Sequence, residues 1–409
     1  MAENVRLIIT NMTYRGSTRR MCILEEDRKI VEIRPESTEN GAAQGDVYMG
    51  QVENAPGNLD AVFVRISPDE RCYLPLKDTQ NAVYSSGTGN RTKPKAGDEL
   101  LVQVTRGKMK TKLSAVSAQL SFPGRYLVLT TGKEGLMFSK KLSANDKERL
   151  KRTLDTLEIH AETGTATEPG FGLLIRTEAV QASKEDLLRE YQSLREIYVA
   201  VAINGSHRTL YSRLYRPDPD YIGMLKDLKE ETAETILTDD RDVMEHISAW
   251  CRANAPSLIP KIKLYEDKLL PLPKLISLER TLDEALKKQV WLKCGGYLVI
   301  EPTEAFISID VNTGKYVSKK KPEEGFREVN REAAEEIARQ LRLRNLSGMI
   351  LIDFINMQNP DHNEELLDIL KKLTKKDPVQ TEVIDMTALH IVEATRKKVR
   401  QSLYETLIC

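Results

Sequence analysis

The stretches FISIDVN (residues 306–312) and MILIDFI (residues 349–355) decide how this chain is built. Each is an apolar, β-branched run of strand length, and each carries one aspartate, Asp310 or Asp353. A carboxylate in a buried strand is unfavourable unless a partner compensates it. Two carboxylates brought together repel each other unless a cation lies between them. The pair therefore predicts a site for a hard divalent ion such as Mg2+.

Side chains alternate along a strand, so Asn312 is expected on the same face as Asp310, where it can orient a carboxylate, a water or a phosphate oxygen. The residues that follow, 313–315 and the lysine run 319–321, form a basic loop suited to an anionic substrate. In the alternative interpretation, each aspartate caps a loop or a helix and the lysines are solvated surface. Two aspartates in one small α/β unit, with Asn312 beside one of them, favour the metal site.

The composition limits which classes of protein the chain can belong to. The chain has 409 residues, too many for a single core, with 40% hydrophobic and 30% charged residues. Lys+Arg and Asp+Glu both number 61, so any nucleic-acid binding must come from local patches. The five cysteines form no CxxC pair, which predicts reduced thiols and a cytoplasmic protein rather than a disulfide framework or a zinc site. We expect neither a signal peptide nor a membrane-spanning segment.

The pattern along the chain indicates several domains. Short strands with turn signals between residues 46 and 105 predict a small closed barrel. Helices are expected after Ser143 and Ser183, which are suitable N-caps. From residue 278 strands and helices alternate, which indicates an α/β region. Its last two elements are expected to be a strand at 379–384 and a helix at 389–407.

Three segments resemble the ribonuclease E/G family of bacterial endoribonucleases: AFISIDVNTGKYV (305–317), REAAEEIARQLRLRNLSGMILIDFINM (331–357) and VEATRKKVRQSL (392–403). The resemblance covers almost the whole chain and implies a multidomain α/β and α+β protein. The implied domains are an RNase H-like core at 1–34 and 216–278, an inserted S1 (OB) RNA-binding barrel at 35–120, a 5′-sensor domain at 121–215, a DNase I-like catalytic subdomain at 279–402 and a tail at 403–409.

The resemblance also implies roles for single residues. It makes Asp310 and Asp353 the Mg2+-binding aspartates and Asn312 the catalytic asparagine beside them. It further implies stacking of RNA bases on Phe63 and Tyr73 of the barrel with Lys110 as a basic RNA-binding residue, and binding of an RNA 5′-monophosphate by Arg176 and Thr177.

Two ordinary alternatives compete with these roles. Phe63 could be a core residue of the barrel, and Arg176 a surface residue of its strand. Base stacking on aromatic rings tolerates any sequence, and arginine binds phosphate through charge-assisted paired hydrogen bonds, so the chemistry suits the implied roles.

The chain departs from the family pattern at several places, one of which is Asn356, where the strand of ribonuclease E carries a second acid. The zinc-binding CPxCxG signature that links two protomers does not occur, so we expect no zinc and, if the chain forms a homodimer, no zinc link. Gln380 stands near the place of a phosphate-sensing arginine, which predicts weaker dependence on the RNA 5′ end. Mn2+ is the alternative ion to Mg2+.

Together these observations predict an endoribonuclease that uses Mg2+ to cleave single-stranded RNA in RNA processing or decay, favours 5′-monophosphorylated ends, and leaves 5′-phosphate and 3′-hydroxyl products. The competing hypothesis is a non-catalytic S1-type RNA-binding protein. A DNA nuclease is disfavoured by the S1 resemblance.

Overall fold

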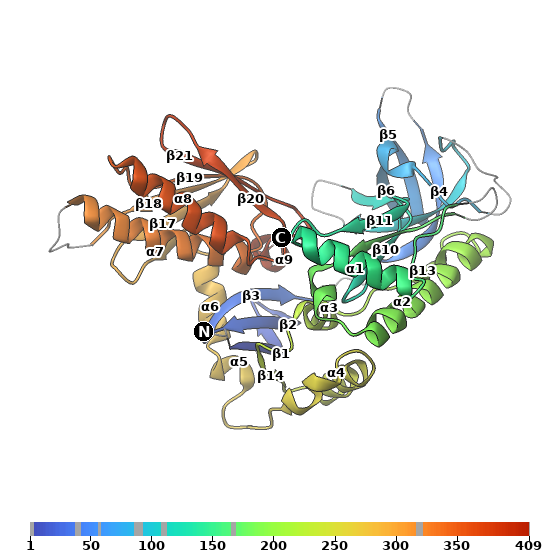
Figure 1. Ribbon diagram of the computed structural model, residues 1–409, viewed down its shortest axis with the longest axis horizontal. Helices are drawn as coiled ribbons and strands as arrows, with labels where there is room; N and C mark the ends of the chain where they lie inside the picture. The colour runs from blue at the N-terminus through green and yellow to red at the C-terminus, as the bar shows by residue number, and fades with distance from the viewer. Residues whose placement is uncertain are drawn as a thin grey trace. The chain divides into compact units, whose positions relative to one another are not determined.

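The computed structural model describes residues 4–36, 42–55, 59–85, 93–107, 113–164, 169–315 and 322–408. The chain divides into two compact units, one made of residues 1–37 and 230–409 and the other of residues 38–229 (Figure 1). The second unit is therefore inserted into the first. The finer domain boundaries stay a prediction.

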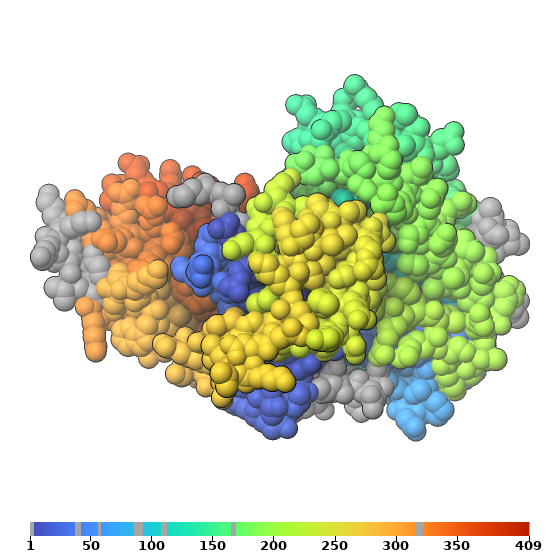
Figure 2. Space-filling model, turned by 90° about the horizontal axis from the view of Figure 1, so that it is seen from below, coloured from blue at the N-terminus to red at the C-terminus, as the bar shows by residue number. Residues whose placement is uncertain are grey.

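The first unit contains a five-stranded sheet with the order β15-β14-β1-β2-β3. Strand β1 pairs parallel with β14 and antiparallel with β2, so the two sequence segments of the unit meet in this sheet. Helix α4 (Arg241–Asn254) connects β14 to β15 through a 3₁₀ turn, and its yellow atoms lie open to solvent in Figure 2. The strands are β1 (Val5–Tyr14), β2 (Ser17–Glu26), β3 (Lys29–Pro35), β14 (Ala233–Thr238) and β15 (Ile262–Leu264).

The same unit carries a six-stranded sheet with the order β16-β17-β18-β19-β21-β20. Helices α7 (Pro322–Leu343) and α8 (Pro360–Thr374) cover one face of this sheet, and their apolar sides join the core beneath it (Figure 1). We call the other face the open face. The strands are β16 (Gln289–Trp291), β17 (Tyr297–Pro302), β18 (Phe306–Asn312), β19 (Gly348–Asp353), β20 (Thr381–Met386) and β21 (Ile391–Arg396).

The expected helix at 389–407 is wrong. Residues 391–396 form β21, which pairs antiparallel with β19 and β20, and only α9 (Leu403–Ile408) is helical. Local composition is rich in helix formers, but Val392, Ala394 and Arg396 are buried at every second position, which is strand periodicity. Pairing with two neighbouring strands outweighs the local helix propensity.

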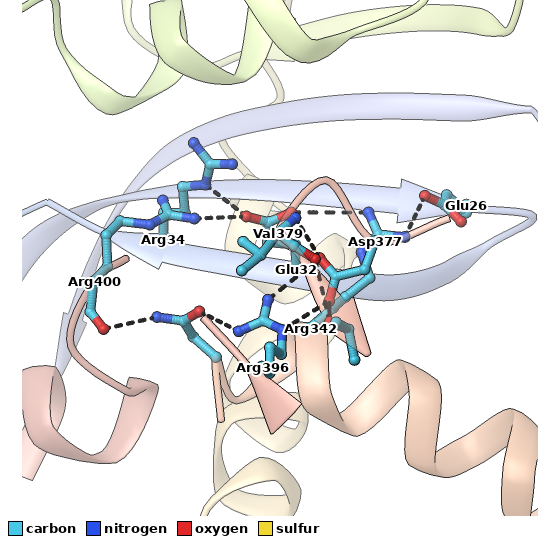
Figure 3. A network of polar contacts seen from close by, with 10 residues as sticks. Glu26, Glu32, Arg34, Arg342, Asp377, Val379, Arg396 and Arg400 are labelled. Carbon is cyan, nitrogen blue, oxygen red and sulfur yellow. Dashed lines mark hydrogen bonds and ion pairs between the residues drawn. The ribbon is translucent and has the colours of Figure 1, made fainter. Parts of the chain in front are cut away.

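An arginine–carboxylate network joins β3 to the six-stranded sheet and its helices (Figure 3). Glu32 accepts hydrogen bonds from Arg34 Nε at 2.6 Å and Arg400 Nη2 at 3.0 Å, with Arg342 Nη2 3.8 Å away. Burial raises the pKa of Glu32, but the three guanidinium groups outweigh it and lower that pKa to about 2. The carboxylate is therefore ionised throughout the physiological range.

A second pair in this network is buried. Arg396 Nε donates to Asp377 Oδ2 at 2.7 Å, and its Nη1 donates to Asn345 Oδ1 at 2.8 Å and to the carbonyl of Leu346 at 2.9 Å. A buried ion pair is tolerated when its remaining donors are also satisfied. These bonds fix the end of β21 against the loop that precedes β19.

In the second unit, β4, β5, β6, β8 and β7 form a barrel that closes through pairing of β4 with β7, and β13 extends β4. The closed barrel confirms the barrel prediction and is consistent with an OB-type S1 barrel. Its strands are β4 (Val47–Asn54), β5 (Ala61–Ser67), β6 (Glu70–Pro75), β7 (Glu99–Arg106) and β8 (Ser114–Ser117), with β13 at Arg213–Tyr215.

The remainder of this unit is a four-stranded sheet, β11-β12-β10-β9, with helices packed on it. The expected caps are present: the hydroxyls of Ser143 and Ser183 accept hydrogen bonds from the backbone N–H groups of Asp146 and Asp186. The elements are β9 (Ser121–Pro123), β10 (Leu127–Thr130), β11 (Gly135–Phe138), β12 (Gly172–Ile175), α1 (Ala144–Thr156), α2 (Lys184–Tyr198) and α3 (Asp220–Asp227).

The remaining helices of the first unit are α5 (Leu272–Leu275) and α6 (Leu278–Ala285), which lead into the six-stranded sheet. Among the described helices, none has the length and apolar character needed to cross a membrane.

Candidate functional site

The two aspartates singled out in the sequence lie side by side. Strands β18 and β19 are parallel neighbours, and Asp310 is in register with Asp353 at their carboxyl ends. Adjacent strands are about 4.8 Å apart, and side chains in register point to the same face. Both carboxylates therefore project from the open face of the six-stranded sheet.

The expectation that these aspartates are deeply buried is wrong. Along β18 every second residue is buried, and these are the apolar residues Ile307, Ile309 and Val311. Asp310 lies on the alternate, half-buried face, and Asp353 is exposed. The apolar character of the two strands thus comes from the face under α7 and α8, and the carboxylates need no compensation for burial. The reason to expect a cation is their mutual repulsion alone.

Asn312 lies on the open face with Asp310, as predicted. Its Nδ2 donates a hydrogen bond to Asp310 Oδ2 at 2.6 Å. This bond fixes the orientation of the carboxylate and leaves Oδ1 of Asp310 and both oxygens of Asp353 available as ligands. We call Asp310, Asn312 and Asp353 the carboxylate site.

The residues of the carboxylate site fit a hard divalent ion. No cationic side chain among the described residues pairs with Asp310 or Asp353. Mg2+ is commonly held by one or two carboxylates together with waters and substrate phosphates, so two aspartates suffice. No group of three or more His, Cys, Asp and Glu residues suited to a metal occurs in the described part of the chain. The lysine run 319–321 lies outside the described residues.

The aromatic residues predicted to bind RNA meet on the barrel. Phe63 of β5 and Tyr73 of β6 are directly opposite in register, with ring centroids 6.4 Å apart in an edge-on arrangement. Their neighbours Val62 and Val64 point into the barrel, whereas Tyr73 is 38% exposed. The alternative that Phe63 is a core residue is therefore wrong. Lys110 lies outside the described residues.

The sequence reasoning missed Arg71 at this place. Its guanidinium carbon lies 4.0 Å from the centroid of the Phe63 ring, and its Nε pairs with Glu53 Oε2 at 2.7 Å. Alternation along RCYLP could have revealed it, since Arg71 and Tyr73 are two residues apart and share a face. The barrel surface thus combines two aromatic rings with a cation stacked on one of them.

Arg176 and Thr177 lie together at the end of β12, where Thr177 begins a 3₁₀ turn. The guanidinium of Arg176 is engaged: Nη1 donates to the carbonyl of Gly124 at 2.7 Å, and Nη2 pairs with Asp227 Oδ1 at 2.5 Å. Both side chains of this pair are about a quarter exposed, at 27% and 28%. Asp227 was not anticipated, because nothing in its local sequence connects it to a strand 51 residues earlier.

The backbone beside Arg176 is held by a half-buried carboxylate. Glu190 of α2 accepts hydrogen bonds at 2.7 Å from the N–H groups of Arg125, Tyr126 and Leu127. Burial raises the pKa of Glu190, and these three donors oppose that rise. These three hydrogen bonds hold the segment that presents the Gly124 carbonyl to Arg176. Gln380, in the other unit, is exposed and donates to Glu382 Oε1 at 2.6 Å.

Comparison with known proteins gives a consistent result. A model of the Ribonuclease E/G family matches residues 121–399. Ribonuclease G of Escherichia coli strain K12 is 31% identical over 391 residues, which cover 93% of this chain and 78% of the relative. Ribonuclease G of Haemophilus influenzae is 30% identical over 396 residues, covering 94% and 78%. Ribonuclease E of a Synechocystis species is 30% identical over 367 residues, covering 88% of this chain and 53% of the relative.

Proposed function

The chain belongs to the ribonuclease E/G family of endoribonucleases, and we propose that it cleaves single-stranded RNA at the carboxylate site with Mg2+ as cofactor. The observation that carries this proposal is the in-register pair Asp310 and Asp353, with Asn312 bonded to the first. In the terms of the family, residues 1–34 and 216–278 would be the RNase H-like domain, and residues 279–402 the DNase I-like subdomain.

Each residue of the carboxylate site has a task in phosphodiester hydrolysis. A divalent ion bound by Asp310 and Asp353 would supply Lewis-acid polarisation of a phosphoryl oxygen and a more acidic water. The hydrogen bond from Asn312 holds Asp310 in one orientation, so no reorganisation is needed when the substrate arrives. The open face above the strand ends gives an extended chain access to both carboxylates. In-line attack by water would leave a 5′-phosphate and a 3′-hydroxyl.

The barrel is proposed to hold the RNA strand. Phe63 and Tyr73 offer ring faces and edges on which bases stack without sequence preference. Arg71 adds a cation beside them, so affinity should fall as salt increases. Lys110 would add a further phosphate contact. A single strand is favoured because paired bases present no free faces for stacking.

A preference for 5′-monophosphorylated RNA is proposed at Arg176 and Thr177. The arginine supplies a forked cation and the threonine a hydroxyl at the same strand end, which together suit a terminal phosphate. The guanidinium of Arg176 is already paired with the Asp227 carboxylate, so a bound phosphate must displace this carboxylate or share the guanidinium with it. We therefore expect a modest preference rather than an absolute requirement.

The proposal is tested by cleavage of a 5′-monophosphorylated, A/U-rich single-stranded RNA, with Mg2+ or with EDTA, and of DNA of the same sequence. The variants are Asp310→Asn and the matched control Glu393→Gln, whose exposed carboxylate stands on the same open face, opposite Leu351. We expect wild type and Glu393→Gln to cut the RNA only with Mg2+, and Asp310→Asn to fail. Tight RNA binding by wild type without cleavage would contradict the proposal and support the non-catalytic alternative.

A further inference from the structure

Two aromatic side chains stand on the open face, close to the carboxylate site. Trp291 of β16 and Tyr297 of β17 are in register, with ring centroids 5.2 Å apart and planes inclined by 53°. Trp291 is 54% exposed, although an indole ring is among the largest apolar groups a protein can bury. The core of this sheet lies on its other face, so the exposed Trp291 ring is available to bind a ligand.

The strand register places this pair in the same row as the carboxylate site. Tyr297 lies directly opposite Asn312, and Trp291 directly opposite Tyr297. Residues directly opposite on antiparallel strands point to the same face. With strands about 4.8 Å apart, the two rings stand about 5 and about 10 Å across the sheet from Asn312.

The Tyr297 ring is held in place by the turn that follows β18. Gly314 has a φ of +54°, and a Cβ there would lie 2.6 Å from the carbonyl oxygen of Gly295 and 3.0 Å from Cδ1 of Tyr297. The next residue, Lys315, donates its backbone N–H to the same carbonyl at 2.9 Å. Only glycine fits this close approach. The turn after the carboxylate site is thereby joined to the β16–β17 hairpin, so the ring and the carboxylates are positioned together.

The charge around the rings suits a polyanion. Lys293, two residues after Trp291, and Lys315 are both exposed. Within the described residues, neither ammonium group has an ion-pair partner. A base stacked on the rings would carry its phosphates past these two cations. Aromatic rings beside cations are the combination with which proteins bind single-stranded nucleic acids.

We propose that Trp291 and Tyr297 form a stacking platform for the base of a nucleotide next to the scissile phosphate of single-stranded RNA. The platform rests on the proposed function, since the carboxylate site sets where the phosphate lies. It would fix the position of the strand at the cleavage point itself, independently of the barrel. Because base stacking has no hydrogen-bond readout, the platform would tolerate any base.

The chain offers a direct optical test, since it has two tryptophans, Trp250 and Trp291. The variant Trp250→Phe leaves Trp291 as the sole indole, and Asp310→Asn added to it keeps the RNA uncut. We expect an A/U-rich single-stranded RNA to quench this fluorescence saturably, with the same midpoint as RNA binding measured by polarisation of a labelled strand. If Trp291 only pairs with Tyr297 to stabilise the hairpin, saturating RNA will leave its fluorescence unchanged, which would overturn the proposal.

Substitution provides the second readout. In an otherwise wild-type chain, Trp291→Ala should weaken binding or raise KM about 5- to 150-fold, while Trp291→Phe, which keeps a ring, should lose much less. The matched control is Met349→Ala: Met349 has the same exposure of 54% on the same face, but lies four residues, about 13 Å, from Asp353 along β19. If Met349→Ala and Trp291→Ala lose RNA affinity equally, RNA binds any apolar group on this face, and the proposed stacking platform is wrong.

The two proposals fail in different ways. If RNA quenches Trp291 but no variant, nor wild type, cleaves RNA, the platform stands and the nuclease assignment falls. If wild type cleaves RNA with Mg2+ but Trp291 fluorescence and the affinity of Trp291→Ala are unaffected, the nuclease stands and the platform falls.

Discussion

The ionisation of Glu32 makes the free energy of unfolding of the first unit depend on pH, with stability lost in acid. Its pKa is lowered from 4.5 to about 2 in the folded chain, because Arg34, Arg400 and Arg342 surround it. A lowered pKa stabilises the fold fully above the unfolded value, and the gain disappears as pH falls through the folded value. The shift corresponds to about 3 kcal/mol at pH 7, of which about 2 kcal/mol should be lost by pH 3.

The variant Glu32→Gln isolates this contribution. Removing the carboxylate leaves three guanidinium groups together, so we expect it to destabilise the unit by about 3 to 5 kcal/mol at pH 7. The difference from wild type should shrink by about 2 kcal/mol between pH 6 and pH 3, because Glu32 becomes protonated in the unfolded wild-type chain over this range while it stays largely ionised in the folded chain. Urea unfolding at several pH values measures this. Tryptophan fluorescence reports the correct unit, because Trp250 and Trp291 both belong to it.

The control for this experiment is Glu393→Gln, which removes an exposed carboxylate from the same unit. Its unfolding should differ from that of wild type by no more than a few tenths of a kcal/mol at any pH. If the difference between wild type and Glu32→Gln stays constant from pH 6 to pH 3, the network does not hold Glu32 ionised, and the reasoning is refuted.

Further predictions concern RNA. Phe63→Ala and Tyr73→Ala should each weaken binding of a single-stranded RNA by about 1 to 3 kcal/mol in a polarisation titration. If the affinity of both variants is unchanged, these rings of the barrel do not bind RNA. Arg176→Ala should abolish any preference for a 5′-monophosphate over a 5′-hydroxyl in cleavage rate. Asp227→Asn should increase that preference roughly 2- to 5-fold, since the competing carboxylate is lost. A decrease in Asp227→Asn would mean that the aspartate orients Arg176 rather than competing with phosphate.

Much of the carboxylate site could be predicted from sequence, because strand alternation alone relates Asp310 to Asn312. The burial of the aspartates could not, since an apolar run does not reveal which of its faces a helix covers. The pairing of Asp310 with Asp353 depends on the parallel register of β18 and β19, which the intervening helix α7 makes possible but no local signal encodes.

The predictions that failed also concern contacts between parts of the chain that are distant in sequence. Residues 391–396 mix helix formers with the β-branched Ile391, Val392 and Thr395, and their pairing with β19 and β20 makes them a strand. The partner of Arg176 is Asp227, in a different element, so no spacing rule could have found it. By contrast, the caps Ser143 and Ser183 depend on a hydrogen bond three residues away, which the local sequence contains entirely.

The central claim is that Asp310 and Asp353 together hold the divalent ion that cleavage requires. It is tested most directly by the single-turnover rate of RNA cleavage as a function of Mg2+ concentration, for wild type, Asp353→Asn and the control Glu393→Gln. We expect Asp353→Asn to need at least about tenfold more Mg2+ for half-maximal rate, because one of two carboxylate ligands is lost, and Glu393→Gln to match wild type. An Asp353→Asn variant with the wild-type rate and the wild-type Mg2+ midpoint would contradict the claim.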